Sequence, residues 1–81
     1  MKQHQHEFVD TYDGLVGFGL QRDIDEATVQ VYLQKFSDDE LMKVILPRMR
    51  QEDLSAVFDL LSDLLRRHLA EEEYHALFLK D

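Results

Sequence analysis

The chain of 81 residues has no cysteine, no tryptophan, one proline and three glycines. Without cysteine there are no thiolate metal ligands, redox pairs or cysteine nucleophiles. Secreted chains of this size usually need disulfides, so we expect a cytoplasmic protein. The scarcity of proline and glycine, together with 13 leucines against six valines and two isoleucines, favours helices over strands.

Long apolar runs and a surplus of basic residues are also absent. No apolar run approaches the roughly 20 residues of a membrane helix, and no apolar segment follows the first residues, so we expect neither a membrane span nor a signal peptide. Acidic side chains outnumber basic ones by 17 to 9, which gives a net charge of −8. Binding to a phosphate backbone needs the opposite balance, so we expect no nucleic-acid partner.

The composition is typical of one small folded domain. Hydrophobic residues make up 44% and charged residues 32% of the chain. We expect a single helical domain over residues 1–81, with residues 1–5 disordered. A chain of this length buries only roughly 60–65% of its unfolded surface, so its stability should be modest unless copies associate.

The spacing of apolar residues predicts an all-α fold, a small bundle of four to five short helices. The first helix runs from about residue 7 to residue 20. Three glycines weaken its second half, since each costs about 1 kcal/mol in a helix interior. If that glycine-containing stretch forms a turn instead, we expect Phe18 to point inward.

The second helix is predicted to begin at a cap formed by Asp23 or by Asp25. A strand over residues 29–33 is the alternative, because apolar residues also alternate there. The main apolar stripe of the helix consists of Val29, Tyr32, Leu33 and Phe36.

The third helix is predicted to start at a capping box over residues 37–40, with Ser37 as the cap. Pro47 should end or kink it, because proline lacks the backbone N–H and clashes with the preceding turn. The fourth helix, from about residue 51 to residue 69, carries the longest apolar stripe. We expect Leu61 to be buried in that stripe, so Leu61→Asp should unfold the protein.

The apolar pattern changes phase near Ala70. If the helix ran straight on, Glu72 would point into the centre of the apolar stripe. The sequence therefore predicts a kink near Ala70 and a separate helix over residues 71–79.

One pattern suggests metal chemistry. Glu72 and His75 match the Glu-x-x-His spacing that places a carboxylate and an imidazole on one helix face, and His68 lies nearby. A di-iron site needs two such motifs, so it would require a dimer, with further carboxylates from Glu7 or Glu40. The alternative is a set of ordinary surface side chains, with His68 as a hydrogen-bonded core or interface residue.

Other catalytic chemistry finds no support in the sequence. The glycine-containing stretch over residues 14–19 matches neither common phosphate-binding pattern. No serine has a histidine at a meaningful spacing, and no carboxylate pair lies in an apolar setting. We therefore predict that the protein is not an enzyme and binds no cofactor.

Several apolar residues predict contacts between molecules. Val31, Val44 and Leu60 lie off the main stripes of their helices, and Tyr74 and Phe78 form the stripe of the last helix. We expect a small acidic protein–protein interaction or regulatory module that acts as a homodimer and binds an unidentified protein partner. The alternatives are a metal-binding helical bundle and an acidic decoy of a nucleic-acid-binding protein.

Overall fold

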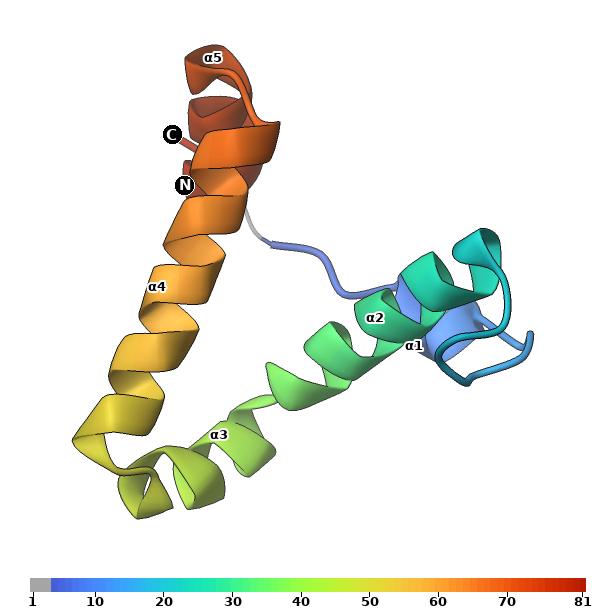
Figure 1. Ribbon diagram of the computed structural model, residues 1–81, viewed down its shortest axis with the longest axis horizontal. Coiled ribbons are helices and arrows are strands. Elements are labelled where there is room, and N and C mark those ends of the chain that lie inside the picture. The colour runs from blue at the N-terminus through green and yellow to red at the C-terminus, as the bar shows by residue number, and fades with distance from the viewer. Residues whose placement is uncertain (1–3) are drawn as a thin grey trace. The chain divides into compact units, whose positions relative to one another are not determined.

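The computed structural model describes residues 4–81. Every regular element in this range is a helix, which confirms the predicted all-α class (Figure 1). In chain order the helices are α1 (Phe8–Thr11), α2 (Arg22–Phe36), α3 (Asp39–Ile45), the 3₁₀ helix η1 (Leu46–Arg48), α4 (Gln51–His68), α5 (Glu71–Glu73) and the π-helix η2 (Tyr74–Leu79). None of the helices within this range has the length and apolar character needed to cross a membrane.

The described chain forms two compact units, Gln5–Ile45 and Leu46–Asp81. A single domain over residues 1–81 stays a prediction. Of the segment predicted to be disordered, residues 1–3 lie outside the described range, whereas His4 and Gln5 precede the first helix.

In the unit Gln5–Ile45, the first helix is much shorter than predicted. α1 ends at Thr11, and the backbone of Tyr12 is extended, with ψ at 122°. Near the other end of the predicted helix, Gly19 has φ at +91°, a conformation that no right-handed helix contains. Residues 12–21 therefore form a loop, so the alternative of a turn over residues 14–19 is confirmed and the helix to residue 20 is wrong.

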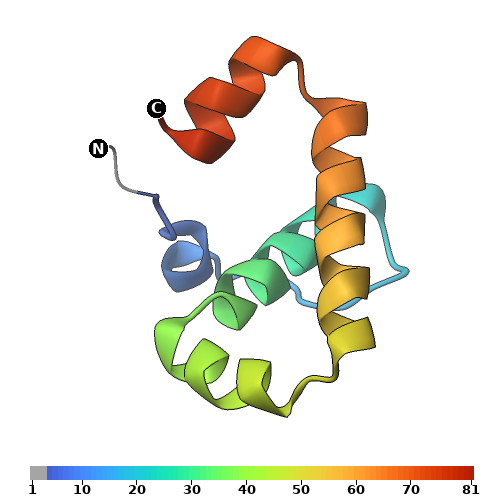
Figure 2. The same cartoon turned by 90° about the vertical axis from the view of Figure 1, so that its left-hand side faces the viewer.

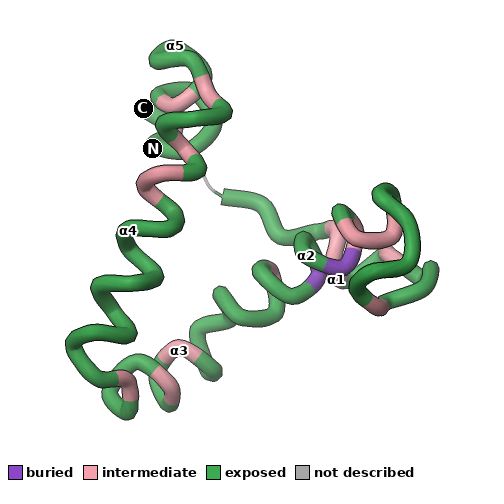
Figure 3. The backbone as a smooth tube through the Cα atoms, viewed as in Figure 1, coloured by how far each residue is buried: buried purple, intermediate pink, exposed green. Residues whose placement is uncertain are grey.

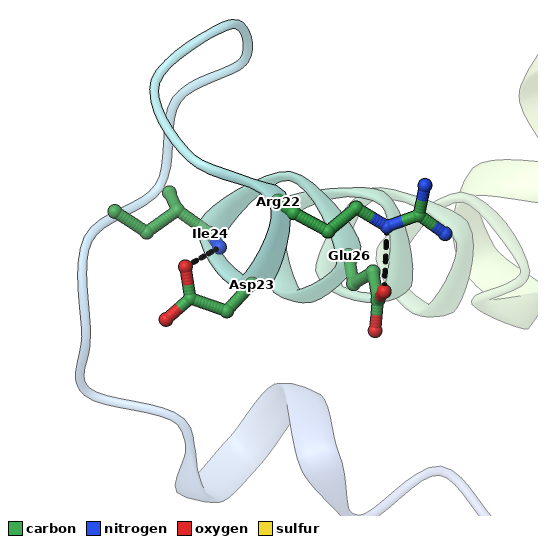
Figure 4. A network of polar contacts seen from close by, with 4 residues as sticks. All are labelled: Arg22, Asp23, Ile24 and Glu26. Atoms are coloured by element: carbon green, nitrogen blue, oxygen red, sulfur yellow. Dashed lines mark hydrogen bonds and ion pairs between the residues drawn. The ribbon is translucent and has the colours of Figure 1, made fainter.

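α2 begins one residue before the first predicted cap, and both capping predictions are wrong. Gln21 is the N-cap and makes no side-chain capping bond. Asp23 accepts a hydrogen bond from the Ile24 N–H at 3.0 Å, inside the first turn (Figure 4). Arg22 donates from Nε to Glu26 at 2.7 Å. This hydrogen bond and the negative charge of Glu26 raise the pKa of Arg22, so the guanidinium stays protonated.

Side chains of α2 hold the segment that precedes it. The Thr28 hydroxyl accepts from the Gly17 N–H at 3.0 Å and donates to the Gly17 carbonyl at 3.2 Å. Asp25 accepts from the Gly19 N–H at 2.8 Å. Nearer the other end of the helix, Gln34 accepts from a backbone N–H of α1, that of Val9, at 2.9 Å. α1 and the loop therefore cover one side of α2.

The covered side of α2 is not the side that the sequence predicts. Thr28 and Val31 are 5% and 6% exposed, and they are the only buried residues within 4–81 (Figure 3). The predicted main stripe is instead exposed, with 45% for Val29, 66% for Tyr32 and 55% for Leu33. The predicted helix spans residues 29–33, which rules out the alternative strand there.

α3 is capped one residue later than predicted. Asp38 Oδ2 accepts from the backbone N–H groups of Glu40 at 3.0 Å and Leu41 at 3.3 Å, while the Ser37 hydroxyl donates to the Gln34 carbonyl at 3.0 Å. α3 ends at Ile45, and the chain continues into the 3₁₀ helix that contains proline. The predicted break near Pro47 is confirmed.

In the unit Leu46–Asp81, α4 is the longest helix, and its predicted bounds are confirmed to within one residue. The Arg50 N–H donates to Asp53 Oδ2 at 3.0 Å, and this hydrogen bond stabilises the N-terminal end of the helix. After α4, Leu69 and Ala70 have extended backbones, with ψ at 140° and 163°. Figures 1 and 2 show the chain turning there into its last helix, so the predicted break near Ala70 is confirmed.

The last helix has the predicted bounds, but its second half is wider than an α-helix. η2 is a π-helix, and the Lys80 N–H donates to the His75 carbonyl five residues earlier, at 2.8 Å. Lys80 ends it in the left-handed conformation, with φ at 61°. The rings of Tyr74 and Phe78 stack with centroids 5.4 Å apart.

Candidate functional site

The candidate metal ligands do not form a cluster. His68 ends α4, whereas Glu72 and His75 follow the break at residues 69–70, and all three are exposed. Within residues 4–81 no group of three or more histidine, aspartate or glutamate side chains is arranged to hold a metal ion. His75 Nδ1 instead lies 3.2 Å from Asp81 Oδ1. A metal site shared between two copies stays a prediction.

One side of α4 in the unit Leu46–Asp81 is apolar, and its own unit leaves most of it exposed. Apolar side chains repeat along it at spacings of three and four residues, which places them on a single face. We call this set the α4 face: Leu54, Val57, Phe58, Leu61, Leu64 and Leu65. Phe58 is the most exposed of them, at 70%, and most of the α4 tube is drawn as exposed (Figure 3). An apolar face of this length without a cover is typical of an interaction surface.

The exposure of Leu61 changes one expectation. Leu61 is 43% exposed and lies in the middle of the α4 face, so it is not buried within its own unit. Substitution by aspartate would then place the charge at a partly solvated position. The prediction that Leu61→Asp unfolds the protein stays a prediction, because the unit Leu46–Asp81 by itself does not bury Leu61.

A second exposed apolar surface lies on the unit Gln5–Ile45. Val29, Tyr32 and Leu33 of α2 adjoin Phe18 of the loop, which is 74% exposed; these four residues form the α2 face. Phe18, Val29 and Leu33 line a shallow groove of about 560 Å³, together with Arg22, Asp25, Glu26, Gln30 and Gln34. The expectation that Phe18 turns inward is wrong, because its side chain stays on the surface.

The five predicted interface residues differ in their accessibility. Val31 is packed inside its own unit beneath the loop, so a second molecule cannot reach it without opening that unit. Val44, Leu60 and Phe78 are 48%, 57% and 47% exposed, and Tyr74 is half-buried. Leu60 lies next to the α4 face, at one edge of it.

The α4 and α2 faces consist of residues that the sequence places on apolar stripes. The apolar pattern of the sequence predicts that both stripes lie in the interior of one chain. A hydrophobic pattern shows which side of a helix avoids water, but not whether the same chain or another covers it. For this reason the sequence does not single out Phe58 and Phe18 as exposed interface residues.

All buried polar side-chain atoms in the described range have hydrogen-bond partners, so no unpartnered buried group indicates a catalytic site. The functional interpretation therefore rests on the exposed faces and their charges. Comparison of the chain with models of protein families, with curated proteins and with solved structures gives no match.

Proposed function

We propose that the chain is a small cytoplasmic protein–protein interaction module that acts as a homodimer through the α4 face. One observation carries the proposal: residues 4–81 contain only two buried residues, and the unit Leu46–Asp81 buries no residue of α4. Burial of apolar surface is the main favourable term in folding, about 25 cal/mol per Å². A second copy is the commonest cover for such a face, because two-fold homodimers dominate among oligomers.

Sedimentation velocity of the protein at micromolar concentration tests this proposal. We expect a species of twice the chain mass of 9.6 kDa. Phe58→Glu should shift the protein to the monomer, because the charge would be buried in the contact. Circular dichroism should show that helicity is retained, since Phe58 is 70% exposed in the single chain.

A matched control comes from the other exposed face. Tyr32 is 66% exposed on α2, so Tyr32→Glu introduces the same charge at a similarly exposed aromatic position outside α4. This variant should remain a dimer. A wild-type protein that sediments as a 9.6 kDa species throughout the micromolar range would contradict the proposal.

The other functions suggested by the sequence stay predictions. The metal-binding bundle lacks a clustered ligand set within residues 4–81. The acidic decoy rests on net charge alone, and acidic residues such as Asp25, Asp38 and Asp53 bind backbone N–H groups of their own chain. No specific contact favours either function over an interaction module.

A further inference from the structure

One edge of the α4 face carries three residues at intervals of seven. Asp53 lies near the start of the helix, Leu60 at its middle and Arg67 near its end. Seven residues are close to two helical turns, so these side chains lie in one row beside the apolar face. The row is acidic at one end, apolar at the centre and basic at the other end.

The two ends of α4 also differ in charge as a whole. Glu52 and Asp53 lie in the first turn, and Arg66, Arg67 and His68 lie in the last turn. A parallel pair of such helices would bring like charges and like dipole ends together. An antiparallel pair brings each acidic end beside a basic end, which is favourable for both the side chains and the helix dipoles.

We propose that two copies of the chain pair through antiparallel α4 helices, about a two-fold axis near Leu60. Asp53 of each copy then lies opposite the partner's Arg67, because both residues are seven positions from the axis. This arrangement rests on the proposed homodimer and specifies its orientation and register. In an antiparallel helix pair, an edge of one helix faces the same edge of the partner helix. The single row therefore provides both Asp53–Arg67 ion pairs.

The same register places the apolar residues in contact. Leu54 lies within two residues, about 3 Å along the helix, of the level of the partner's Leu64, and Val57 lies equally close to the level of the partner's Leu61. Phe58 and Leu60 lie nearest the axis, where each approaches its own copy. They are the two most exposed apolar residues of α4, at 70% and 57%. The arrangement therefore covers the side chains that the single chain leaves most accessible to water.

Both charged residues of the row remain accessible for an intermolecular contact. Asp53 uses Oδ2 to bind the backbone of its own helix start, and Arg67 uses Nε to bind Asp63 at 2.8 Å. The Arg67 side chain is nevertheless 56% exposed. The ion pairs between copies would add to the contacts within each helix rather than replace them.

Cross-linking of single-cysteine variants tests the orientation, and the natural absence of cysteine makes each label unique. Positions 53 and 67 are separated by about 21 Å along the helix. A mixture of Asp53→Cys and Arg67→Cys proteins should give a cross-linked dimer with a short bis-maleimide, and each variant alone should give little. The readout is the molecular mass on a denaturing gel and the identity of the linked peptides.

The opposite pattern overturns the orientation. Efficient cross-linking of each variant with itself, and none between the two variants, would indicate a parallel dimer. The proposed homodimer would stand in that case, because the protein would still sediment as a dimer. A monomer by sedimentation would overturn both the orientation and the homodimer.

Charge reversal tests the ion pairs without cysteine. Arg67→Asp should raise the dimer dissociation constant about fivefold at low salt, because it turns two attractive contacts into repulsive ones. Arg66→Asp is the matched control, since Arg66 is next in the chain but lies on the outer side of α4, away from the row. Equal effects of the two substitutions would contradict the proposed pairing.

A double substitution completes the test. Asp53→Arg on its own also removes the contact to the Arg50 N–H, so it serves as the reference for the double variant. The double variant Asp53→Arg/Arg67→Asp restores opposite charges in the row and should bind more tightly than Asp53→Arg alone. Weaker binding of the double variant would show that the two positions do not face one another.

Discussion

At the scale of single residues, the loop before α2 depends on a backbone conformation that favours glycine and on backbone groups that one hydroxyl binds. Gly19 adopts a positive φ, and both backbone groups of Gly17 bind the Thr28 hydroxyl. The two glycines differ in their requirements, because a Cβ added at Gly17 would meet Leu20 Cδ1 at an ordinary distance of 3.5 Å. They therefore allow a matched comparison.

Gly19→Ala should lower the free energy of unfolding by about 1–2 kcal/mol, because an alanine Cβ clashes with its own backbone in the left-handed region. Gly17→Ala is the control and should be neutral or slightly stabilising, since it restricts the unfolded chain without strain. Urea unfolding followed by circular dichroism measures both values. Equal destabilisation by the two substitutions would contradict this explanation.

Thr28→Val keeps the volume of the side chain but removes the hydroxyl. The Gly17 N–H and carbonyl would then lose their partner in a half-buried place, so we expect a loss of about 1–3 kcal/mol. Thr11→Val is the control, because the Thr11 hydroxyl is exposed and makes only long contacts, at 3.3 and 3.5 Å. Chemical unfolding that gives the same midpoint for both variants would rule out a structural role for the Thr28 hydroxyl.

At the scale of elements, the N-terminal cap of α3 is not the residue that the sequence predicts. The sequence favours Ser37, whereas Asp38 accepts the two N–H bonds at the helix start. Asp38→Ala should therefore destabilise the protein by about 1 kcal/mol. Ser37→Ala should change stability by no more than a few tenths of a kcal/mol. Thermal or urea unfolding measures both, and a larger effect at Ser37 would favour the cap expected from sequence.

The sequence predicts elements well where one strong pattern decides them. The bounds of α4 follow from a long apolar stripe, and the breaks follow from Pro47 and from the change of phase near Ala70. The cap of α3 was misplaced by one residue because adjacent Ser37 and Asp38 both have capping side chains. The glycines favour the observed turn over residues 14–19, but apolar spacing does not predict the extended backbone of Tyr12 that ends the first helix at Thr11.

The candidate site was only half predictable for a related reason. Sequence reasoning found the α4 stripe and placed Leu60 at an interface, but it expected Leu61 to be buried. It also chose the wrong side of α2, since Thr28 and Val31 are covered through hydrogen bonds from the loop to the helix. Such polar contacts depend on tertiary geometry and leave no periodic pattern in the sequence.

At the scale of the whole molecule, the proposed homodimer would make stability depend on association, because residues 4–81 bury only Thr28 and Val31. The midpoint temperature of thermal unfolding should therefore rise with protein concentration. We expect a rise of several degrees when a low micromolar concentration is increased about a hundredfold. Phe58→Glu should remove this dependence, because the variant does not dimerise. Calorimetry or circular dichroism across the concentration series measures it, and an invariant wild-type midpoint would argue against coupled folding and association.

The hydrogen bonds between the loop and α2 have a further consequence for local dynamics. Asp25, Thr28 and Gln34 of α2 hold backbone groups within residues 9–19. When these side-chain contacts break, helix α2 keeps its own backbone hydrogen bonds. We therefore expect residues 9–19 to detach from α2 together, by local rather than global unfolding. Its amide protons should exchange with solvent faster than those of α2, and each detachment briefly uncovers Val31, the only apolar side chain that residues 4–81 bury.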